Sequence, residues 1–151
     1  MAIIKILTEP DPALREKSLP VQKINAGVLR VLDNMIETMK AADGVGLAAP
    51  QIGVLKRMAV VDVDGLSVEL INPEILEMAG EQVGSEGCLS VPGYVGEVTR
   101  AKKIKVKALN RNGDEIVIEA ENHRARCIQH EIDHLDGVLY IDRATRIVED
   151  G

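Results

Sequence analysis

Hydrophobic and polar residues follow two different periods along the chain. From about Gly27 to Lys40 apolar residues recur every three or four positions, and this spacing predicts an amphipathic helix that packs on the core. Lys103–Leu109 alternates strictly between apolar and polar residues, which predicts a strand with one buried face. A second helix is expected from about Asn122 to Asp136, because Gly137 is typical of the position that ends a helix.

Shorter apolar runs predict further strands between these elements. The candidates are Met58–Asp62, Val68–Asn72, Glu74–Ala79, Val95–Arg100 and Glu115–Glu119. The Asn112-Gly113 pair that precedes the last of them is typical of a hairpin turn. Asp43–Gly53 predicts a glycine-rich loop, and the glycines and proline of Gly84–Pro92 suit a segment whose backbone approaches a ligand.

Composition and charge narrow the classes of protein to which the chain can belong. A length of 151 residues fits a single domain with a real core. Phe and Trp are absent and the formal net charge is -6, so direct nucleic-acid binding is not expected. No apolar stretch has the length of a membrane span. Two cysteines without an export signal predict a protein of the reducing cytoplasm rather than a disulfide framework.

The strongest chemical signal is the segment Gln129–His134, which reads QHEIDH. On a helix, His130 and His134 lie one turn apart on one face, so both can bind one metal ion. Glu131 lies beside them, where it can handle the proton of a water on that ion, as in H-E-x-x-H hydrolases. The alternative is a surface helix with two solvated histidines, which is weakened because two of the chain's three histidines have this spacing. The opposite side of the helix is apolar, so we expect other parts of the chain to pack against both sides of this helix.

The remaining metal ligand is expected upstream of this helix. Catalytic sites usually take three protein ligands and leave one position for water, but no histidine follows His134, and Tyr140 stands where a metzincin protease has its third histidine. Cys88 is the best candidate, although a lone cysteine is more often a small buried hydrophobe. Cys127 fits that plainer role or lines the cavity. His123 is on the same helix face, but roughly 10 Å along the axis is too far to share the ion.

Three segments together resemble the signature motifs of the peptide deformylase family. They are Gly44–Gln51 (GVGLAAPQ), Glu86–Ser90 (EGCLS) and Gln129–Gly137 (QHEIDHLDG). They occur in the family's order and spacing, and the similarity runs from about Ile3 to Asp142. The resemblance implies an α+β fold in which mixed or antiparallel sheets pack around a central C-terminal helix carrying the HExxH motif, with an additional N-terminal amphipathic helix. It also implies one catalytic domain over residues 1–151.

The resemblance further implies a reaction and a cofactor. Peptide deformylases hydrolyse the formyl group from the N-formylmethionine of nascent polypeptides and release formate. Cys88, His130 and His134 would bind one divalent metal ion, expected to be Fe2+, which Zn2+, Ni2+ or Co2+ can replace. Water on the metal would attack the formyl carbonyl, with Glu131 as general base and then as general acid.

Other residues would contact the substrate. The side-chain amide of Gln51 and the backbone N–H of Leu89 would stabilise the oxyanion by resemblance to the family. The remaining substrate-binding candidates are Gly44, Val45, Gly46 and Cys127. The two glycines would let the backbone pair with a peptide like an extra strand, and the other two would line an apolar pocket for methionine. A flexible loop and plain core packing are the alternatives.

Two further features concern the surroundings of the ligands. Glu86, Arg100 and Asp133 are expected to orient them, with surface ion pairing as the alternative. At Asn122-His123-Arg124 the chain departs from the glycine and two apolar residues that are usual in the family. Asn tolerates a left-handed turn, but His123 would make the mouth of the methionine pocket more polar. No C-terminal helix for docking on the ribosome is expected, so proximity to the ribosome is the most that is implied.

Two other functions would use the same helix. A metallopeptidase that cleaves internal peptide bonds would need a third ligand other than Cys88. A structural or metal-carrier domain would close the site with four protein ligands, and Glu131 would then be dispensable.

Overall fold

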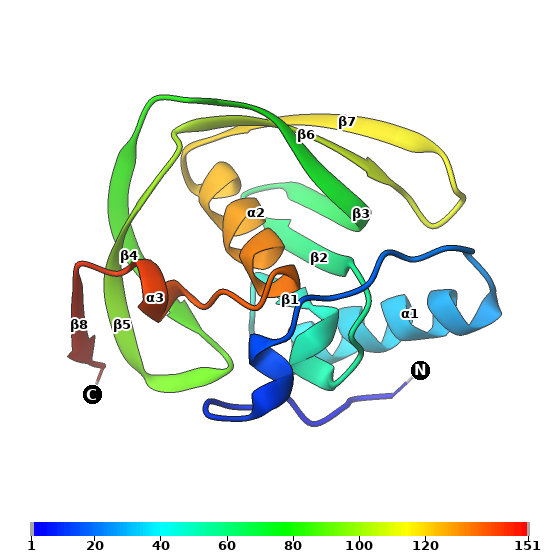
Figure 1. Cartoon of the computed structure of the whole chain (residues 1–151), viewed down its shortest axis with the longest axis horizontal. Helices are drawn as coiled ribbons and strands as arrows, with labels where there is room; N and C mark the ends of the chain where they lie inside the picture. The colour runs from blue at the N-terminus through cyan, green and yellow to red at the C-terminus, as the bar shows by residue number, and fades with distance from the viewer. Residues whose placement is uncertain (1, 151) are drawn as a thin grey trace.

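Two antiparallel sheets lie on different sides of a central helix in the computed structural model, which describes residues 2–150 (Figure 1). The first sheet consists, in spatial order, of β1 (Gly46–Ala48), β2 (Met58–Val63), β3 (Leu66–Ala79), β6 (Lys103–Leu109) and β7 (Glu115–Glu121). The second consists of β4 (Gln82–Cys88), β5 (Val91–Arg100) and β8 (Arg146–Glu149). The helices are α1 (Ala26–Ala41), α2 (Asn122–Leu135) and α3 (Tyr140–Arg143), with 3-10 turns at Pro12–Arg15 and Ala49–Ile52. The antiparallel sheets and the helices confirm the α+β class.

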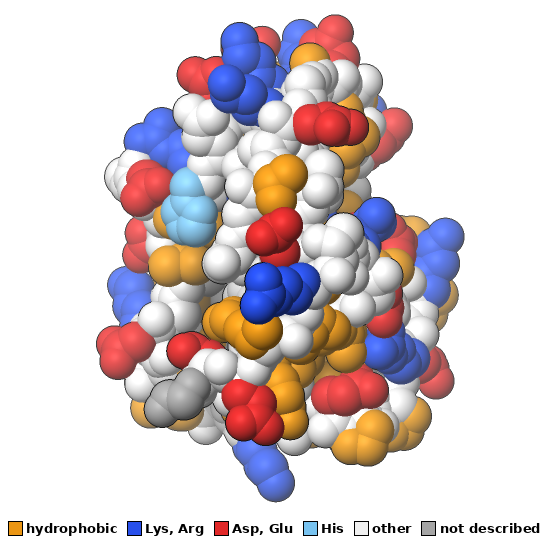
Figure 2. All heavy atoms as spheres, turned by 90° about the vertical axis from the view of Figure 1, so that its left-hand side faces the viewer, with side chains coloured by type: hydrophobic (Ala, Val, Ile, Leu, Met, Phe, Trp, Pro, Cys, Tyr) orange, Lys and Arg blue, Asp and Glu red, His pale blue; other side chains and the backbone are white. Residues whose placement is uncertain are grey.

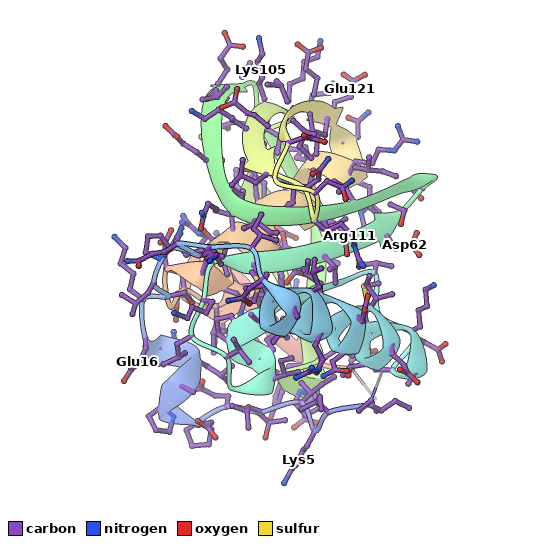
Figure 3. The ribbon with its side chains drawn as sticks, turned by 90° about the vertical axis from the view of Figure 1, so that its right-hand side faces the viewer. Lys5, Glu16, Asp62, Lys105, Arg111 and Glu121 are labelled. Carbon is purple, nitrogen blue, oxygen red and sulfur yellow. The ribbon has the colours of Figure 1, made fainter. Side chains whose placement is uncertain are left out.

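Helix α1 forms where the apolar period predicts it. The Asn25 side chain caps its start by accepting a hydrogen bond of 3.0 Å from the backbone N–H of Val28. Leu32, Met35 and Met39 are buried and belong to the same core cluster as side chains of β2. Figure 3 shows α1 lying against the lower edge of β2 and β3, while the far ends of β6 and β7 project away from it. The amphipathic face therefore decides where α1 docks.

Helix α2 is buried along most of its length. Its apolar stripe is buried, and so are His130, Glu131 and His134 on the other side. Figure 1 shows α2 in the middle of the molecule, with β4 and β5 beyond one side and β2 and β3 beyond the other. Asn122 begins the helix in a left-handed conformation, φ 58°, which its side chain tolerates. Among residues 2–150, no helix combines the length and the hydropathy needed to cross a membrane.

The two strands predicted at Val68–Asn72 and Glu74–Ala79 are one strand, so this part of the prediction was wrong. β3 continues through Asn72-Pro73, pairing with β2 in its first half and with β6 in its second. Asn72 takes the left-handed conformation, φ 52°, and its side-chain amide makes hydrogen bonds of 2.8 and 2.9 Å to the backbone of Val21. These bonds replace the ladder pairs lost at the irregularity, so the strand bends without ending.

Two segments interpreted as irregular also contain strands. The loop expected at Asp43–Gly53 includes the short strand β1, which pairs with β2 and is the last strand of its sheet. Gly84–Pro92 is mostly the hairpin of β4 and β5, in which Cys88 pairs with Val91 across a two-residue turn. Both segments contain several glycines and a proline, so strand pairing here depends on partners elsewhere in the chain rather than on local propensity. The Asn112-Gly113 hairpin is confirmed, with a turn over residues 110–114.

Candidate metal centre and active site

Three side chains from distant parts of the sequence converge at the end of β4. Cys88 is the last residue of β4, and His130 and His134 lie one turn apart on α2. One ligand atom from each lies within 4.8 Å of the others, and the Cys88 Sγ is 3.3 Å from the His134 Nε2. No other cluster of this kind, and no fourth ligand, occurs among residues 2–150. One thiol and two imidazoles form a donor set that fits a divalent transition metal with an open position, rather than a closed structural site.

The ring of His130 is held by a buried carboxylate. Its Nδ1 lies 2.8 Å from Glu86 Oε1, which leaves Nε2 to face the cluster. Arg100 donates two hydrogen bonds of 2.8 Å to Glu86, and Arg126 donates a third of 2.6 Å. Burial favours the neutral acid, but the hydrogen bonds from Arg100 and His130 outweigh it and hold the pKa of Glu86 far below its usual range. Arg100 also binds Asp133 at 2.6 Å. The contacts expected among Glu86, Arg100 and Asp133 are therefore present.

The two imidazoles have opposite electrostatic surroundings. Burial lowers the pKa of His130, but hydrogen bonds to Cys88 and Glu86 raise it to about 10. Burial, together with the positive charge of His130, lowers the pKa of His134 well below its ordinary value. His134 Nδ1 is buried and has no hydrogen-bond partner among the described residues. Since imidazole binds metals as the neutral base, His134 is already in the ligand form, and a cation would displace the proton of His130.

Glu131 occupies a tight and buried position. It is 5% exposed, and its Oε1 has no hydrogen-bond partner among the described residues. The other carboxylate oxygen lies against Gly46 of β1, so closely that a Cβ at that position would collide with it. Burial raises the pKa of Glu131 to about 7. A carboxylate with this pKa can both accept and return a proton near neutral pH.

Gln51 reaches the same cluster from the 3-10 turn that follows β1. Its Oε1 accepts a hydrogen bond of 2.9 Å from the backbone N–H of Ala48, which fixes the orientation of the amide. Its Nε2 donates to Ser90 Oγ at 3.0 Å and lies 3.6 Å from the Cys88 sulfur. Leu89, between Cys88 and Ser90, is therefore in the turn that faces Gln51. The structure brings both predicted oxyanion donors to the side of the ligand Cys88.

A pocket of about 370 Å³ opens at this cluster. All four predicted substrate-binding residues line it, namely Gly44, Val45, Gly46 and Cys127. Gln51, Leu89, Glu131 and the ligands Cys88 and His130 line it as well. Burial raises the pKa of the Cys127 thiol to about 12, so this side chain stays neutral. His123 also lines the pocket and is exposed. Figure 2 shows the side of the molecule that carries β4, β5 and β8. Histidine atoms reach the surface there, and hydrophobic side chains gather among charged ones.

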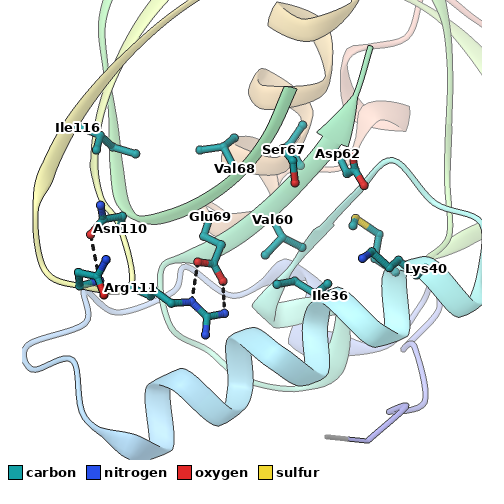
Figure 4. Close-up of a pocket in the computed structure, with 13 residues that line it drawn as sticks. Ile36, Lys40, Val60, Asp62, Ser67, Val68, Glu69, Asn110, Arg111 and Ile116 are labelled. Atoms are coloured by element: carbon teal, nitrogen blue, oxygen red, sulfur yellow. Dashed lines mark hydrogen bonds and ion pairs between the residues drawn. The ribbon is translucent and has the colours of Figure 1, made fainter. Parts of the chain in front are cut away.

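A second hollow, of about 470 Å³, lies on another side of the molecule between α1, β2, β3 and the β6–β7 turn. Figure 4 shows Arg111 at one end of it, paired with Glu69 of β3. Lys40 and Asp62 lie toward the other end. The described residues that line it include no histidine or cysteine. Size alone therefore does not locate the chemistry, and the smaller pocket with clustered ligands is the candidate active site.

Sequence reasoning missed three residues of the site. Arg126 is 4% exposed and binds Glu86, and its position one turn before His130 on the ligand face of the helix was the available signal. Tyr140 stacks on the His130 ring, with ring centroids 6.1 Å apart, and is one of only two aromatic residues in the chain. Ser90 is fully buried and accepts the hydrogen bond from Gln51. Ser90 ends the EGCLS motif, but the motif alone indicated no role for its side chain.

Fold and site together define the class of protein: a metal-dependent hydrolase in which a buried glutamate stands beside a Cys-His-His ligand set. Comparison with known proteins gives the family. The model of the polypeptide deformylase family matches residues 3–150. The peptide deformylase of Syntrophomonas wolfei is 62% identical over 149 residues, covering 97% of this chain and 98% of that protein. The peptide deformylase of Carboxydothermus hydrogenoformans is 56% identical over 151 residues, covering 100% of this chain and 99% of that protein.

Solved structures agree with these sequence relatives. The crystal structure of the peptide deformylase from Thermotoga maritima has a TM-score of 0.93 and 46% sequence identity, and the match covers 95% of this chain and 99% of that chain. The chain belongs to the peptide deformylase family, whose members remove the N-formyl group from nascent polypeptides and depend on a metal ion. Internal cleavage by a metallopeptidase is not favoured.

Proposed function

We propose that the chain, residues 1–151, acts as one catalytic domain in which Cys88, His130 and His134 hold one divalent metal ion, expected to be Fe2+. The observation that carries the proposal is the convergence of the three ligand atoms within 4.8 Å of one another beside the buried Glu131. A thiolate with two imidazoles also suits Zn2+, Ni2+ and Co2+, which can replace iron. The bound ion would polarise a carbonyl and lower the pKa of a water molecule.

Glu131 is the proton carrier in this proposal. It takes the proton of the attacking water and delivers it to the nitrogen of the departing amine when the formyl C–N bond breaks. A pKa of about 7 supports both roles, because base and acid are then both populated near neutral pH. The close backbone of Gly46 holds the carboxylate in place on the pocket side.

Gln51 and Leu89 stabilise the negative charge that develops on the formyl oxygen. The Gln51 amide is oriented in advance by Ala48 and Ser90, so it loses little freedom when the transition state forms. The backbone N–H of Leu89 follows directly on the ligand Cys88. Donors that are already fixed cost no reorganisation at the moment of reaction.

The substrate lies along β1 in this proposal. β1 is the last strand of its sheet, so a peptide can add to it through backbone hydrogen bonds near Gly44 and Gly46. Val45 and Cys127 then line the pocket for the first side chain. Glu86, Arg100 and Asp133 orient His130 from behind. The partners are N-formylmethionyl nascent chains, met in the cytoplasm, and proximity to the ribosome stays a prediction.

A formate-release assay tests the proposal. Protein purified anaerobically with Fe2+ or Ni2+ is incubated with a formyl-Met peptide, and formate and internal cleavage products are measured together. We expect Glu131→Ala to nearly abolish formate release while the metal content persists, and Cys88→Ala to lose the metal itself. Glu119→Ala, an exposed substitution on β7, serves as the matched control. The proposal fails if either site variant keeps the wild-type rate, or if internal cleavage outpaces formate release.

A further inference from the structure

The short helix α3 contacts the surroundings of the metal ligands at both of its ends. It follows α2 after a turn at Gly137 and lies against β4 and β5 (Figure 1). Its first residue, Tyr140, stacks on His130, and its last, Arg143, binds a carboxylate of α2. None of its residues lines the active-site pocket, so α3 has no part in contacting the substrate there. Two separate contacts with one metal site indicate a role in positioning it.

The ring of Tyr140 covers one face of the His130 imidazole. The two rings stack with centroids 6.1 Å apart and planes inclined by 23°, within the range of offset aromatic pairs. The Tyr140 hydroxyl donates a hydrogen bond of 3.1 Å to the backbone carbonyl of Tyr94 on β5, and a Cβ at Gly96 would lie 3.0 Å from the Tyr140 ring. β5 therefore holds the Tyr140 ring in place. Because Glu86 already holds Nδ1 of His130, a ring against one face opposes rotation of the imidazole out of that hydrogen bond.

Arg143 is joined to His130 by a chain of ion pairs. Its Nε and Nη2 donate hydrogen bonds of 2.6 and 3.0 Å to the two carboxylate oxygens of Asp133. One of these oxygens also accepts a hydrogen bond of 2.6 Å from Arg100. Arg100 in turn donates two hydrogen bonds to Glu86, the partner of His130 Nδ1.

This ion pair differs from an ordinary surface pair. Exposed pairs contribute little as a rule, because solvent screens them and both side chains are free to move. Here the Asp133 side chain is only 14% exposed, and Arg143 binds both of its oxygens. Bidentate pairing fixes the orientation of a carboxylate as well as its place. Arg143 therefore holds Asp133 in the orientation in which it binds Arg100.

Partners behind a ligating histidine set the orientation of its ring, and their loss typically costs about 10–100-fold in metal affinity or activity. We propose that α3 positions the metal site: the Tyr140 ring and the Arg143 ion pair keep the His130 imidazole where its Nε2 faces the other two ligands. Both are positioning residues, since neither is a ligand or lines the pocket. The inference rests on the ligand set of the proposed function.

Arg143→Gln tests the chain of ion pairs. We expect the dissociation constant for Co2+, measured by competition with a chelator under anaerobic conditions, to rise by about tenfold. The visible absorption of the bound Co2+ should change with the ligand geometry. With a formyl-Met peptide, kcat should fall while KM keeps its wild-type value, because Arg143 is outside the pocket. Arg146→Gln, the same change at an exposed arginine of β8, is the matched control and should alter none of these values.

A second background shows whether Arg143 acts through Asp133. Asp133→Asn alone should weaken Co2+ binding, because it removes the charge that both arginines bind. Residues that act through one network are not additive. Arg143→Gln should therefore add no further loss of Co2+ affinity in the Asp133→Asn background.

Two variants of Tyr140 separate its ring from its hydroxyl. Tyr140→Phe keeps the ring on His130 and loses only the hydrogen bond to Tyr94, so the Co2+ affinity and spectrum should match the wild type. Tyr140→Leu loses the stacked ring and should weaken Co2+ binding by about tenfold. Thermal melting of each variant shows that the measurements are made on folded protein.

The proposal is overturned if either Arg143→Gln or Tyr140→Leu keeps the wild-type Co2+ affinity and spectrum, even where its melting temperature falls. It is also overturned if Tyr140→Phe loses as much affinity as Tyr140→Leu, or if Arg143→Gln has its full effect in the Asp133→Asn background. Cys88→Ala, measured alongside, should fail to hold Co2+ at this site. If Cys88→Ala binds Co2+ as tightly as the wild type, the ligand set of the proposed function fails, whatever the α3 variants do.

Discussion

Gly46→Ala isolates the contact between β1 and Glu131. Gly46 sits in ordinary strand conformation, so the added methyl group introduces no backbone strain. Its Cβ would come within 3.0 and 3.1 Å of Glu131 Cδ and Cγ, and closer still to the carboxylate oxygen. Carbon atoms pack at about 3.5–4.0 Å. The carboxylate must therefore retreat by roughly 0.5–1 Å, or β1 must move away from α2 by the same distance.

A displacement of this size removes the base from its working position. A misplacement of about 1 Å costs roughly 100-fold in rate, which is about 2.7 kcal/mol of transition-state stabilisation. We expect kcat for a formyl-Met peptide to fall by roughly that factor, while metal content stays unchanged because none of the three ligands is touched. A formate-release assay measures kcat, and metal analysis of the same preparation measures the metal content. Gly27→Ala, the same change on the distant helix α1, is the control and should keep the wild-type rate.

A double-mutant cycle then shows whether the methyl group acts through Glu131. Overpacking in the wild-type background should destabilise the protein by about 1–3 kcal/mol. In a Glu131→Ala background the collision is gone, so Gly46→Ala should change the melting temperature little. The reasoning is refuted if Gly46→Ala keeps nearly full activity, or if it destabilises both backgrounds equally.

Three further outcomes follow from the surroundings of the site. The kcat/KM should rise with pH through an apparent pKa near 7, because Glu131 must be ionised to accept a proton; a pH–rate profile with its midpoint near 4.5 would contradict this. Glu86→Gln should destabilise the fold by about 3–5 kcal/mol at neutral pH, because the buried Arg126 loses its carboxylate partner and Arg100 keeps only Asp133. Glu86 has a lowered pKa in the folded state, so its contribution to stability is present above the ordinary glutamate pKa of 4.5 and is lost as pH falls further. The difference in melting temperature should therefore narrow below that pH. Asn72→Ala should cost about 1–3 kcal/mol in urea unfolding, because both hydrogen bonds to Val21 disappear.

Much of the site could be predicted because helical periodicity is a local property. Three and four residues separate side chains by one turn wherever a helix forms, so the proximity of His130, Glu131 and His134 followed from their spacing alone. The third ligand is different. Its position depends on how the β4–β5 hairpin packs on α2, more than forty residues away, so the sequence alone made Cys88 only the best candidate among upstream residues and the family resemblance strengthened it. The structure brings the three ligand atoms within 4.8 Å.

The two long helices, the alternating strand β6 and the chemistry of the HExxH segment could be predicted from the sequence, because each is set by the period of neighbouring residues. The strands within Asp43–Gly53 and Gly84–Pro92 depend on the folded chain, because glycine-rich segments have weak conformational preferences and pair when a partner strand lies beside them. The pairing of Arg126 with Glu86 likewise appears only in the folded chain. Contacts of that kind depend on long-range packing, which no local spacing encodes.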